Sequence, residues 1–220
     1  MSGKILIVCA PSGGGKGTII GELKKIYGDS MKISVSCTSR NPRGSEQDGV
    51  DYYFIKHDEF VELNKQGFFA ESNIYGNGKA YGTPAKAFED SLESGSLCVL
   101  DIDVNGAAQI INRYYKDYPI VAIFLVPESL KELTIRLLRR NTETLDEIDK
   151  RIKTARLEYR KLLDGTEKLF DAIMLNASGR QHETAESVAR LIESINEPRA
   201  TKEVSNNEER RTDILKCEAW

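Results

Sequence analysis

The sequence lacks any hydrophobic run long enough to cross a membrane. Its first apolar segment covers only residues 5–10, and no later segment reaches spanning length. A membrane-spanning helix needs about 20 predominantly apolar residues, and the apolar core of a signal peptide is also longer than this segment. We therefore expect neither a membrane protein nor a secretory signal. Internal repeats and low-complexity tracts are missing too, so a globular core is expected.

Cysteine is scarce and is not arranged in pairs. The residues Cys9, Cys37, Cys98 and Cys217 are widely scattered along the chain. Their spacing matches neither a zinc site nor a redox dithiol, and reduced thiols are the simpler interpretation. A cytoplasmic location follows as an expectation, because reduced thiols persist in that compartment.

No charge of one sign dominates. The formal net charge is only -3, from 31 basic and 34 acidic residues. No overall field marks the chain as a partner of nucleic acid or of a membrane surface, so any basic chemistry must be local. With 220 residues, of which 40% are hydrophobic and 30% charged, the chain has the composition of a soluble globular protein with one sizeable core. We expect a monomer or a weak homo-oligomer.

Short apolar runs alternate with stretches of helical periodicity, which predicts an α/β fold. The runs are apolar on both faces, as in a parallel sheet that helices cover on both sides. Helical periodicity lies between and after them. The predicted strands are residues 5–9, 97–100, 120–126 and 172–175, and the predicted helices are residues 18–27, 84–93, 129–140 and 183–195.

Three stretches depart from this alternation. A region rich in turns and aromatic residues predicts a small mixed lobe, a charge-rich region predicts a weakly anchored helical flap, and the C-terminal stretch is polar. The predicted organisation is a core of residues 1–33, 84–135 and 161–196, a lobe of residues 34–83, a flap of residues 136–160 and a loosely ordered tail of residues 197–220.

A glycine-rich loop with a lysine follows the first predicted strand and runs directly into a helix. Its glycines let successive backbone amides converge on phosphate oxygens, and the helix N-terminus adds partial positive charge. A glycine-rich turn with a solvated lysine is the alternative, but strand, loop, lysine, hydroxyl and helix occur in the order that an ATP site requires. The candidate ATP-binding residues here are Pro11, Ser12, Gly13, Gly14, Gly15, Lys16, Gly17 and Thr18.

This loop departs from the usual phosphate-loop pattern at two positions. Ala10 stands where the pattern opens with glycine, and Gly17 stands where a serine or threonine normally follows the lysine. Thr18 is the nearest hydroxyl that can reach a magnesium ion, so we assign Thr18 to the metal.

Two arginines flank a proline in the segment of residues 36–43. Pro42 stiffens the chain between Arg40 and Arg43, and guanidinium groups present planar donors that suit a phosphate dianion. Such arginines are often only a solvated loop. Beside an ATP loop, they indicate a second phosphate.

Three weaker motifs follow in order along the chain: Phe69-Ala70-Glu71, Tyr81-Gly82-Thr83 and Asp101-Ile102-Asp103. With the glycine-rich loop and the two arginines, this ordered set means that the chain resembles a guanylate kinase from its first strand to roughly Asn176. The resemblance implies a P-loop NTPase core with a parallel sheet flanked by helices, a small mixed GMP-binding lobe at residues 34–83 and a helical lid at residues 136–160. It also implies a GMP site formed by Ser36, Arg40, Arg43, Tyr52, Glu71, Tyr81, Thr83, Asp101 and Asp103.

Elementary hydrogen bonding gives several of these residues sensible roles. Guanine carries two donors, N1–H and the 2-amino group, beside the acceptor O6. Glu71 suits the donors, and Ser36 and Thr83 suit O6. Adenine presents an acceptor at N1 instead, so this site should reject AMP. The phosphate of GMP would be held by the four remaining lobe residues, Arg40, Arg43, Tyr52 and Tyr81.

Two acidic residues end the predicted strand at residues 97–100. Asp101 and Asp103 lie on the same side of an extended chain, where they can serve magnesium-bound water or the nucleotide. Capping of the following helix is the competing explanation. The sequence does not decide which of the two aspartates would serve the metal and which would bind guanine.

The charge-rich region resembles the family's lid, in which arginines close over the transferring phosphoryl group. Arg140 and Arg151 match its catalytic positions, beside Lys16, and Arg136 shares a helix face with Arg140. Asn176 stands where the family places a residue that contacts adenine. The aspartate expected two residues later is replaced by Ser178.

Residues 73–80 are expected to form a loop about one residue longer than the family pattern, with the extra residue bulging outward.

These observations predict Mg2+-assisted, in-line transfer of the γ-phosphate of ATP to GMP, and to dGMP as well, giving ADP and GDP. Two alternatives stand beside this function. One is a non-catalytic guanylate-kinase-like module that binds a protein, and the other is a nucleoside monophosphate kinase with another acceptor such as AMP.

Overall fold

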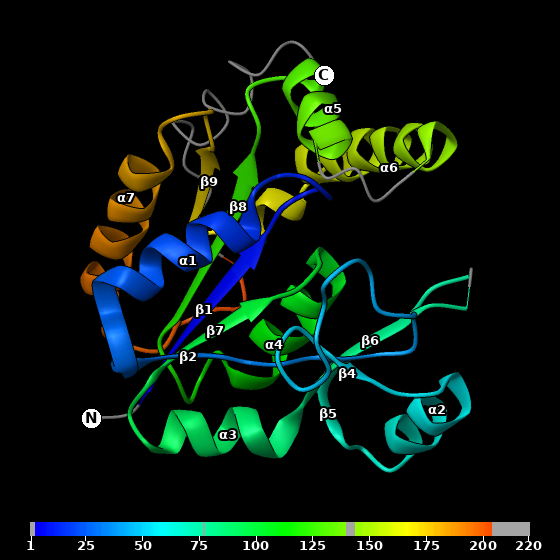
Figure 1. Ribbon diagram of the computed structural model, residues 1–220. Coiled ribbons are helices and arrows are strands. Elements are labelled where there is room, and N and C mark those ends of the chain that lie inside the picture. The colour runs from blue at the N-terminus through cyan, green and yellow to red at the C-terminus, as the bar shows by residue number, and fades with distance from the viewer. Residues whose placement is uncertain (1–2, 77, 140–143, 204–220) are drawn as a thin grey trace.

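The main sheet consists of five parallel strands. The computed structural model describes residues 3–76, 78–139 and 144–203, without the side chains of residues 161, 163 and 167. The strand order is β2 (Met31–Ile33), β7 (Leu97–Asp101), β1 (Lys4–Cys9), β8 (Ile120–Val126) and β9 (Ala172–Leu175). All four strands predicted from apolar runs are present, and the predicted α/β fold is confirmed (Figure 1).

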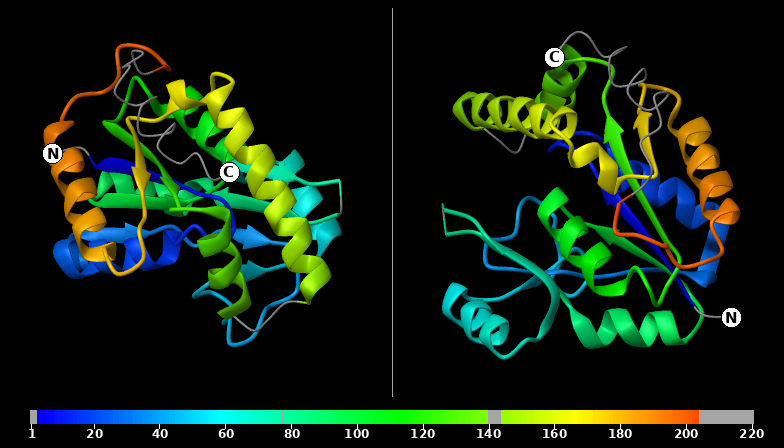
Figure 2. Two further views of the ribbon diagram at one scale, coloured as in Figure 1. Left: turned by 90° about the horizontal axis from the view of Figure 1, so that it is seen from above. Right: turned by 180° about the vertical axis from the view of Figure 1, so that it is seen from behind.

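Helices cover both faces of this sheet, because alternate side chains of each strand point to opposite faces. Ile5 and Ile7 of β1 pack towards α3 (Ala85–Glu93) and α4 (Val104–Tyr114). Leu6 and Val8 pack towards the helices of the other face, which are α1 (Lys16–Tyr27) and α7 (Gln181–Ser194) (Figure 2).

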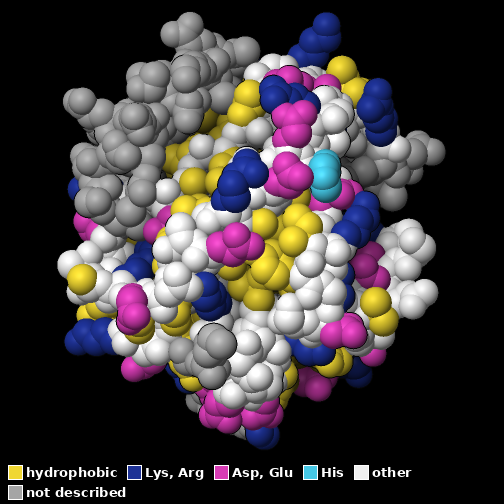
Figure 3. Space-filling model, turned by 90° about the vertical axis from the view of Figure 1, so that its left-hand side faces the viewer, with side chains coloured by type: hydrophobic (Ala, Val, Ile, Leu, Met, Phe, Trp, Pro, Cys, Tyr) yellow, Lys and Arg dark blue, Asp and Glu magenta, His cyan; other side chains and the backbone are white. Residues whose placement is uncertain are grey.

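The face formed by α1 and α7 carries hydrophobic side chains near its centre, with charged side chains around them (Figure 3). The hydroxyl of Tyr27 at the end of α1 donates a hydrogen bond to the backbone oxygen of Ala189 in α7, at 3.3 Å. Tyr27, Leu191 and Ile195 are partly buried against the core beneath. This packing holds α1, and with it the loop before it, against the sheet.

A second, mixed sheet lies beside the main one. Its order is β4 (Tyr53–Phe54), β3 (Cys37–Thr38), β6 (Ala80–Pro84) and β5 (Phe69–Ile74), with α2 (His57–Lys65) packed against it. It has a small core of its own, formed by Cys37, Phe60, Phe69 and Ala80. The strands of this sheet lie within the predicted lobe of residues 34–83, apart from Pro84 at the end of β6. That these residues form a separate lobe stays a prediction.

The helices α5 (Leu130–Arg139) and α6 (Leu145–Leu163) form a helical pair above the carboxyl ends of the main strands (Figure 1). They share a small apolar cluster of Leu133, Leu137, Ile148 and Ala155. Both helices continue past the predicted limits at residues 136 and 160, and the lid role remains a prediction. Short 3-10 helices occupy Gly28–Ser30 and Thr166–Leu169.

The first residues of the predicted tail dock on the core. Arg199 forms an ion pair with Asp171, and both side chains are about 90% buried, at 9% and 11% exposed. Arg199 also donates to the backbone oxygen of Leu169 at 3.2 Å, and Asp171 accepts from the amide of Ala122 at 2.7 Å. The chain beyond α7 is therefore tied to the start of β8, while residues 204–220 lie outside the described residues.

Three of the four cysteines, Cys9, Cys37 and Cys98, are buried free thiols, and Cys217 lies outside the described residues. Across residues 3–76, 78–139 and 144–203, no helix is both long and apolar enough to span a membrane.

Candidate active site

The phosphate loop joins the carboxyl end of β1 to the N-terminus of α1, where open α/β sheets bind ligands. Gly15 has φ 93°, and a side-chain carbon there would lie 2.3 Å from Nδ2 of Asn176. That amide group donates to the backbone oxygen of Gly14 at 2.8 Å. Asn176 thus supports the loop, and only glycine fits between them.

Lys16 begins α1, and its ammonium group lies at the carboxyl end of the neighbouring strand β7. Its Nζ is 3.2 Å from the backbone oxygen of Ala10 and 3.3 Å from Oδ1 of Asp101. Burial is the largest single influence and lowers the pKa of Lys16, but the neighbouring anionic groups, led by the carboxylate of Asp101, together raise that pKa above its ordinary value. The lysine therefore carries a full positive charge at neutral pH.

One cavity lies on the outer side of the loop, beside α5 and the end of β9. It measures about 240 Å³ and contains three of the predicted nucleotide side chains, those of Thr18, Arg136 and Asn176. Arg136 donates to Oε1 of Glu132 at 2.9 Å and to the backbone oxygen of Asn176 at 2.8 Å. Asn176 is 1% exposed, and its Oδ1 has no partner within the described part of the chain.

A second cleft lies on the other side of Lys16, between the two sheets. It measures about 150 Å³ and is lined by Lys16, Ser36, Tyr52, Glu71, Asn73, Tyr75, Tyr81, Asp101, Ile102 and Asp103. Seven of these ten residues are sequence-predicted site residues, and they come from both sheets and from the loop. A lysine at one end and a buried carboxylate at the other make this cleft complementary to a ligand that carries both a phosphate and hydrogen-bond donors.

Glu71 provides that buried carboxylate. It is 5% exposed, and its Oε1 accepts a hydrogen bond from the hydroxyl of Thr83 at 2.6 Å. A side-chain carbon at Gly106 would lie 2.6 Å from Oε2, so the glycine lets α4 approach the carboxylate in the position that Glu71 adopts here. Burial raises the pKa of Glu71 to about 7, with the hydrogen bond from Thr83 opposing the shift and the charge of Asp103 adding to it.

Asp103 both caps a helix and faces the cleft. Its Oδ1 accepts from the amide of Gly106 at 2.8 Å, which confirms the capping explanation. Its Oδ2 accepts from Nδ2 of Asn73 at 2.9 Å and from the hydroxyl of Tyr75. Asp101 is instead paired with Lys16. The two aspartates therefore line the same cleft with different partners, Asp101 with the phosphate-loop lysine and Asp103 with residues of the small sheet.

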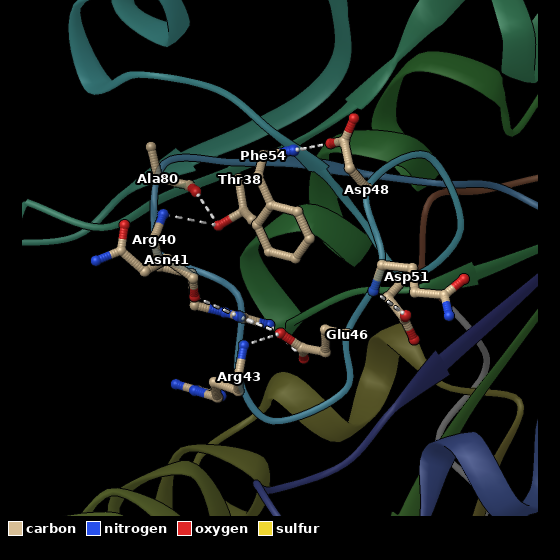
Figure 4. A network of polar contacts seen from close by, with 10 residues as sticks. Thr38, Arg40, Asn41, Arg43, Glu46, Asp48, Asp51, Phe54 and Ala80 are labelled. Atoms are coloured by element: carbon tan, nitrogen blue, oxygen red, sulfur yellow. Dashed lines mark hydrogen bonds and ion pairs between the residues drawn. The ribbon is translucent and has the colours of Figure 1, made fainter.

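The arginine loop is held together by Glu46 (Figure 4). Arg40 is 8% exposed and forms a bidentate pair with Glu46 at 2.6 and 2.8 Å, and Glu46 also accepts from the amide of Arg43 at 2.8 Å. The guanidinium of Arg40 lies 4.8 Å from the ring centre of Tyr52. Neither arginine lines the cleft of about 150 Å³ itself, and Arg40 stands behind Tyr52.

Of the two predicted catalytic arginines of the lid, Arg151 contacts the phosphate loop. Arg151 lies on α6 and donates a hydrogen bond to the hydroxyl of Ser12 in the phosphate loop. The helix pair is thus in direct contact with the loop. The other predicted lid residue, Arg140, lies outside the described residues.

Sequence reasoning missed several residues that line the two cavities: Asn73, Tyr75, Ile102, Glu132, Arg139 and Gln181. Arg139 lies in the charge-rich region of the sequence, where one arginine among several carries no distinguishing signal. The others stand in ordinary polar or apolar surroundings along the chain, and no local motif marks them.

Comparisons with known proteins agree on one family. The family model described as guanylate kinase matches residues 2–195. A guanylate kinase of Clostridioides difficile is 41% identical over 194 residues, covering 88% of this chain and 86% of that protein. A guanylate kinase of Lawsonia intracellularis is 42% identical over 161 residues, covering 73% of each chain. The crystal structure of guanylate kinase from Anaplasma phagocytophilum superposes with a TM-score of 0.67 at 29% identity, covering 88% of this chain and 86% of that one.

Proposed function

The chain belongs to the guanylate kinase family, and on this premise we propose that Lys16 and Glu71 mark the two ends of its GMP site. The chain is an ATP-dependent kinase that phosphorylates GMP. The observation that carries the proposed site is one cleft with the phosphate-loop lysine at one end and a buried carboxylate, hydrogen-bonded to Thr83, at the other.

Guanine fits the carboxylate end of the cleft. The carboxylate of Glu71 can accept hydrogen bonds from N1–H and from the 2-amino group, and the hydroxyl of Ser36 is suited to O6. The hydroxyl of Thr83 donates its one proton to Glu71, so Thr83 would orient that carboxylate instead of donating to O6 as the sequence suggested. Adenine would place the lone pair of its N1 against this carboxylate, which leaves a buried acceptor without a donor and costs binding. Asp103 lies at the same end and is the second acidic group available to the base.

The phosphate end contains groups that can hold two phosphates in line. Backbone amides of the loop and Lys16 would hold the ATP phosphates, and Tyr52 and Tyr81 would hold the phosphate of GMP. Arg40, which lies against the ring of Tyr52, supplies positive charge from behind. The attacking oxygen of GMP is already anionic, so no general base is needed and catalysis depends on positioning and charge stabilisation.

Mg2+ is the cofactor that this chemistry implies. The hydroxyl of Thr18 is exposed where the loop enters α1, and the carboxylate of Asp101 lies at Lys16. Both are hard oxygen donors of the kind that Mg2+ prefers, and the ATP phosphates would complete its shell. We propose that these two residues hold the ion or its water molecules, where it would supply charge neutralisation to the β- and γ-phosphates.

The adenine half of ATP would occupy the cavity of about 240 Å³ beside Arg136 and Asn176. The unpaired Oδ1 of Asn176 is an acceptor in a buried position, which suits the 6-amino group of adenine. Arg151, and Arg140 by its place in the chain, would close over the transferring phosphoryl group and exclude water.

A non-catalytic module that binds a protein is not favoured, because such modules lose the phosphate-loop lysine and the lid arginines, and here Lys16 and Arg151 are present. We also propose that dGMP is accepted and that the enzyme is cytoplasmic, the latter because three buried thiols are free.

The proposed function is tested by product stoichiometry. Wild-type protein with ATP, Mg2+ and GMP should form ADP and GDP in equal amounts, and ADP formation should nearly stop when GMP is omitted. Formation of ADP at the same rate without GMP would identify an ATPase and contradict the proposal.

The pH dependence should follow Glu71. Its pKa of about 7 applies to the free enzyme, and only the ionised carboxylate accepts both guanine donors. We expect kcat/KM for GMP to be constant above pH 8 and to fall towards about tenfold per unit below pH 6 as the carboxyl gains a proton. The control is Glu71→Gln with the same substrate, because the titration of the GMP phosphate remains while that of residue 71 is gone. Parallel profiles for the two proteins would contradict the assignment.

A further inference from the structure

A polar contact joins the small sheet to the core at the rim of the proposed GMP cleft. Asn73 is in β5, and Tyr75 follows β5 in the hairpin that leads to β6. Asp103 belongs to the core, between β7 and α4. Both Nδ2 of Asn73, at 2.9 Å, and the hydroxyl of Tyr75 donate to Oδ2 of Asp103. We call these three residues the Asp103 clasp.

Both carboxylate oxygens of Asp103 are held, Oδ2 by the clasp and Oδ1 by the start of α4. Oδ1 accepts from the amide of Gly106 at 2.8 Å, so the carboxylate cannot rotate without losing a helix cap. Burial and the hydrogen bond to Asp103 raise the pKa of Tyr75, so the hydroxyl keeps its proton and acts as the donor. The hairpin is thereby attached to a point that α4 holds in place.

The clasp also ends a row of tyrosines along the cleft. The rings of Tyr75 and Tyr81 meet edge to face with centres 5.9 Å apart, and the rings of Tyr81 and Tyr52 meet similarly at 6.1 Å. All three line the cleft, as do Asn73 and Asp103. A shift of Tyr75 would therefore move the tyrosine that we assign to the phosphate of GMP.

The cleft has one wall from the small sheet and one from the core, so its width depends on what connects them. Below the clasp, Gln109 of α4 forms two hydrogen bonds with the backbone of Ser72, at 3.1 and 2.9 Å. That contact attaches the strand beside Glu71, and the clasp attaches the side chains at the rim. Tyr75 is 38% exposed, so its hydroxyl is not part of the core that keeps the chain folded.

We propose that Asn73 and Tyr75 are positioning residues for GMP, which hold the two walls of the acceptor cleft at the spacing that the nucleotide needs. This inference rests on the proposed placement of GMP. A cleft that is already ordered lowers the free-energy cost of binding GMP, because the nucleotide does not have to order the side chains itself. Loss of the clasp should therefore weaken the binding of GMP and leave the binding of ATP unchanged.

The test uses Tyr75→Phe, which removes only the hydroxyl and keeps the ring on Tyr81. Asn73→Ala removes the second donor through a different side chain. For each variant we expect KM for GMP to rise roughly three- to tenfold, with kcat and KM for ATP within about twofold of wild type and an unchanged thermal midpoint. The split between KM and kcat separates positioning from general loss of structure.

Tyr53→Phe is the matched control, because Tyr53 is similarly exposed, at 43%, and does not line the cleft. It should change none of the four quantities. If wild type turns over GMP and both clasp variants keep its KM for GMP within twofold, the clasp is contradicted while the proposed function stands. A wild type that forms no GDP contradicts the proposed function, and the clasp with it.

Discussion

Lys16→Met should lower kcat by about a hundred- to a thousandfold while the protein stays folded. The lysine is the charged group shared by the phosphate loop and the acceptor cleft, and its ammonium lies 3.3 Å from Asp101. Methionine has similar length and no charge, so the phosphates lose a cation but no core cavity opens. Asp101 is 37% exposed on its side chain, so water can solvate it once the lysine is gone.

The measurement is kcat with saturating ATP and GMP, together with the thermal midpoint. Lys25→Met is the matched control, because Lys25 lies on the same helix with a side chain 72% exposed and forms only a surface pair with Glu22. Turnover of Lys16→Met within tenfold of wild type would remove the phosphate-loop lysine from the mechanism.

Glu71→Gln should lower kcat/KM for GMP by roughly one to two powers of ten. The carboxylate can accept from both N1–H and the 2-amino group, whereas an amide can accept from one of them and presents a donor to the other. A hydrogen bond to a charged group contributes about 1.5–3 kcal/mol, which corresponds to that loss. Thr83 can still donate to the amide oxygen, so the fold around residue 71 should persist.

IMP makes this prediction sharper, because it keeps N1–H and O6 but has no 2-amino group. Wild type should use IMP poorly, and the preference for GMP over IMP should shrink in Glu71→Gln. Glu62→Gln, an exposed change on α2, should leave the ratio as it is in wild type. An unchanged ratio in Glu71→Gln would mean that another group recognises the base, with Asp103 the next candidate.

The phosphate loop and the main sheet could be predicted because their signals are local. A strand buried on both faces has a continuous apolar run, and the loop's glycines, lysine and helix follow one another in the chain. The boundaries were less accurate at α1, which begins at Lys16 rather than at residue 18. Gly15 and Gly17 near that start weaken helix propensity, so the helical pattern in the sequence does not reach the first turn of α1.

The resemblance to a known family predicted the main residues of the acceptor site, but it did not predict the hydrogen bonds and ion pairs between them. Asn73 and Tyr75 contact Asp103 across 30 and 28 positions of sequence, and no periodicity can express such a contact. The bidentate pair of Arg40 with Glu46 was missed for a different reason. Arg40 was assigned to the phosphate of GMP, but whether an arginine faces a ligand or a neighbouring carboxylate depends on the folded loop.

The docking of the predicted tail at Arg199 was also missed from the sequence. The composition of the tail is polar and of mixed charge, which is typical of a loosely ordered end. Yet Arg199 is buried against Asp171, because the start of β8 and the segment just before β9 bring the carboxylate of Asp171 and the backbone oxygens of Ile120 and Leu169 to its place in the fold. A single buried ion pair leaves no pattern in the surrounding sequence.

The most direct test of the central claim is the rate of ADP formation by the wild-type protein with a panel of nucleoside monophosphates. GMP, AMP, IMP, CMP and UMP are compared at equal concentration with saturating ATP and Mg2+. A cleft with Lys16 at one end and the carboxylate of Glu71 at the other predicts kcat/KM for GMP at least about a hundredfold above that for AMP. Equal or faster turnover of AMP would contradict it.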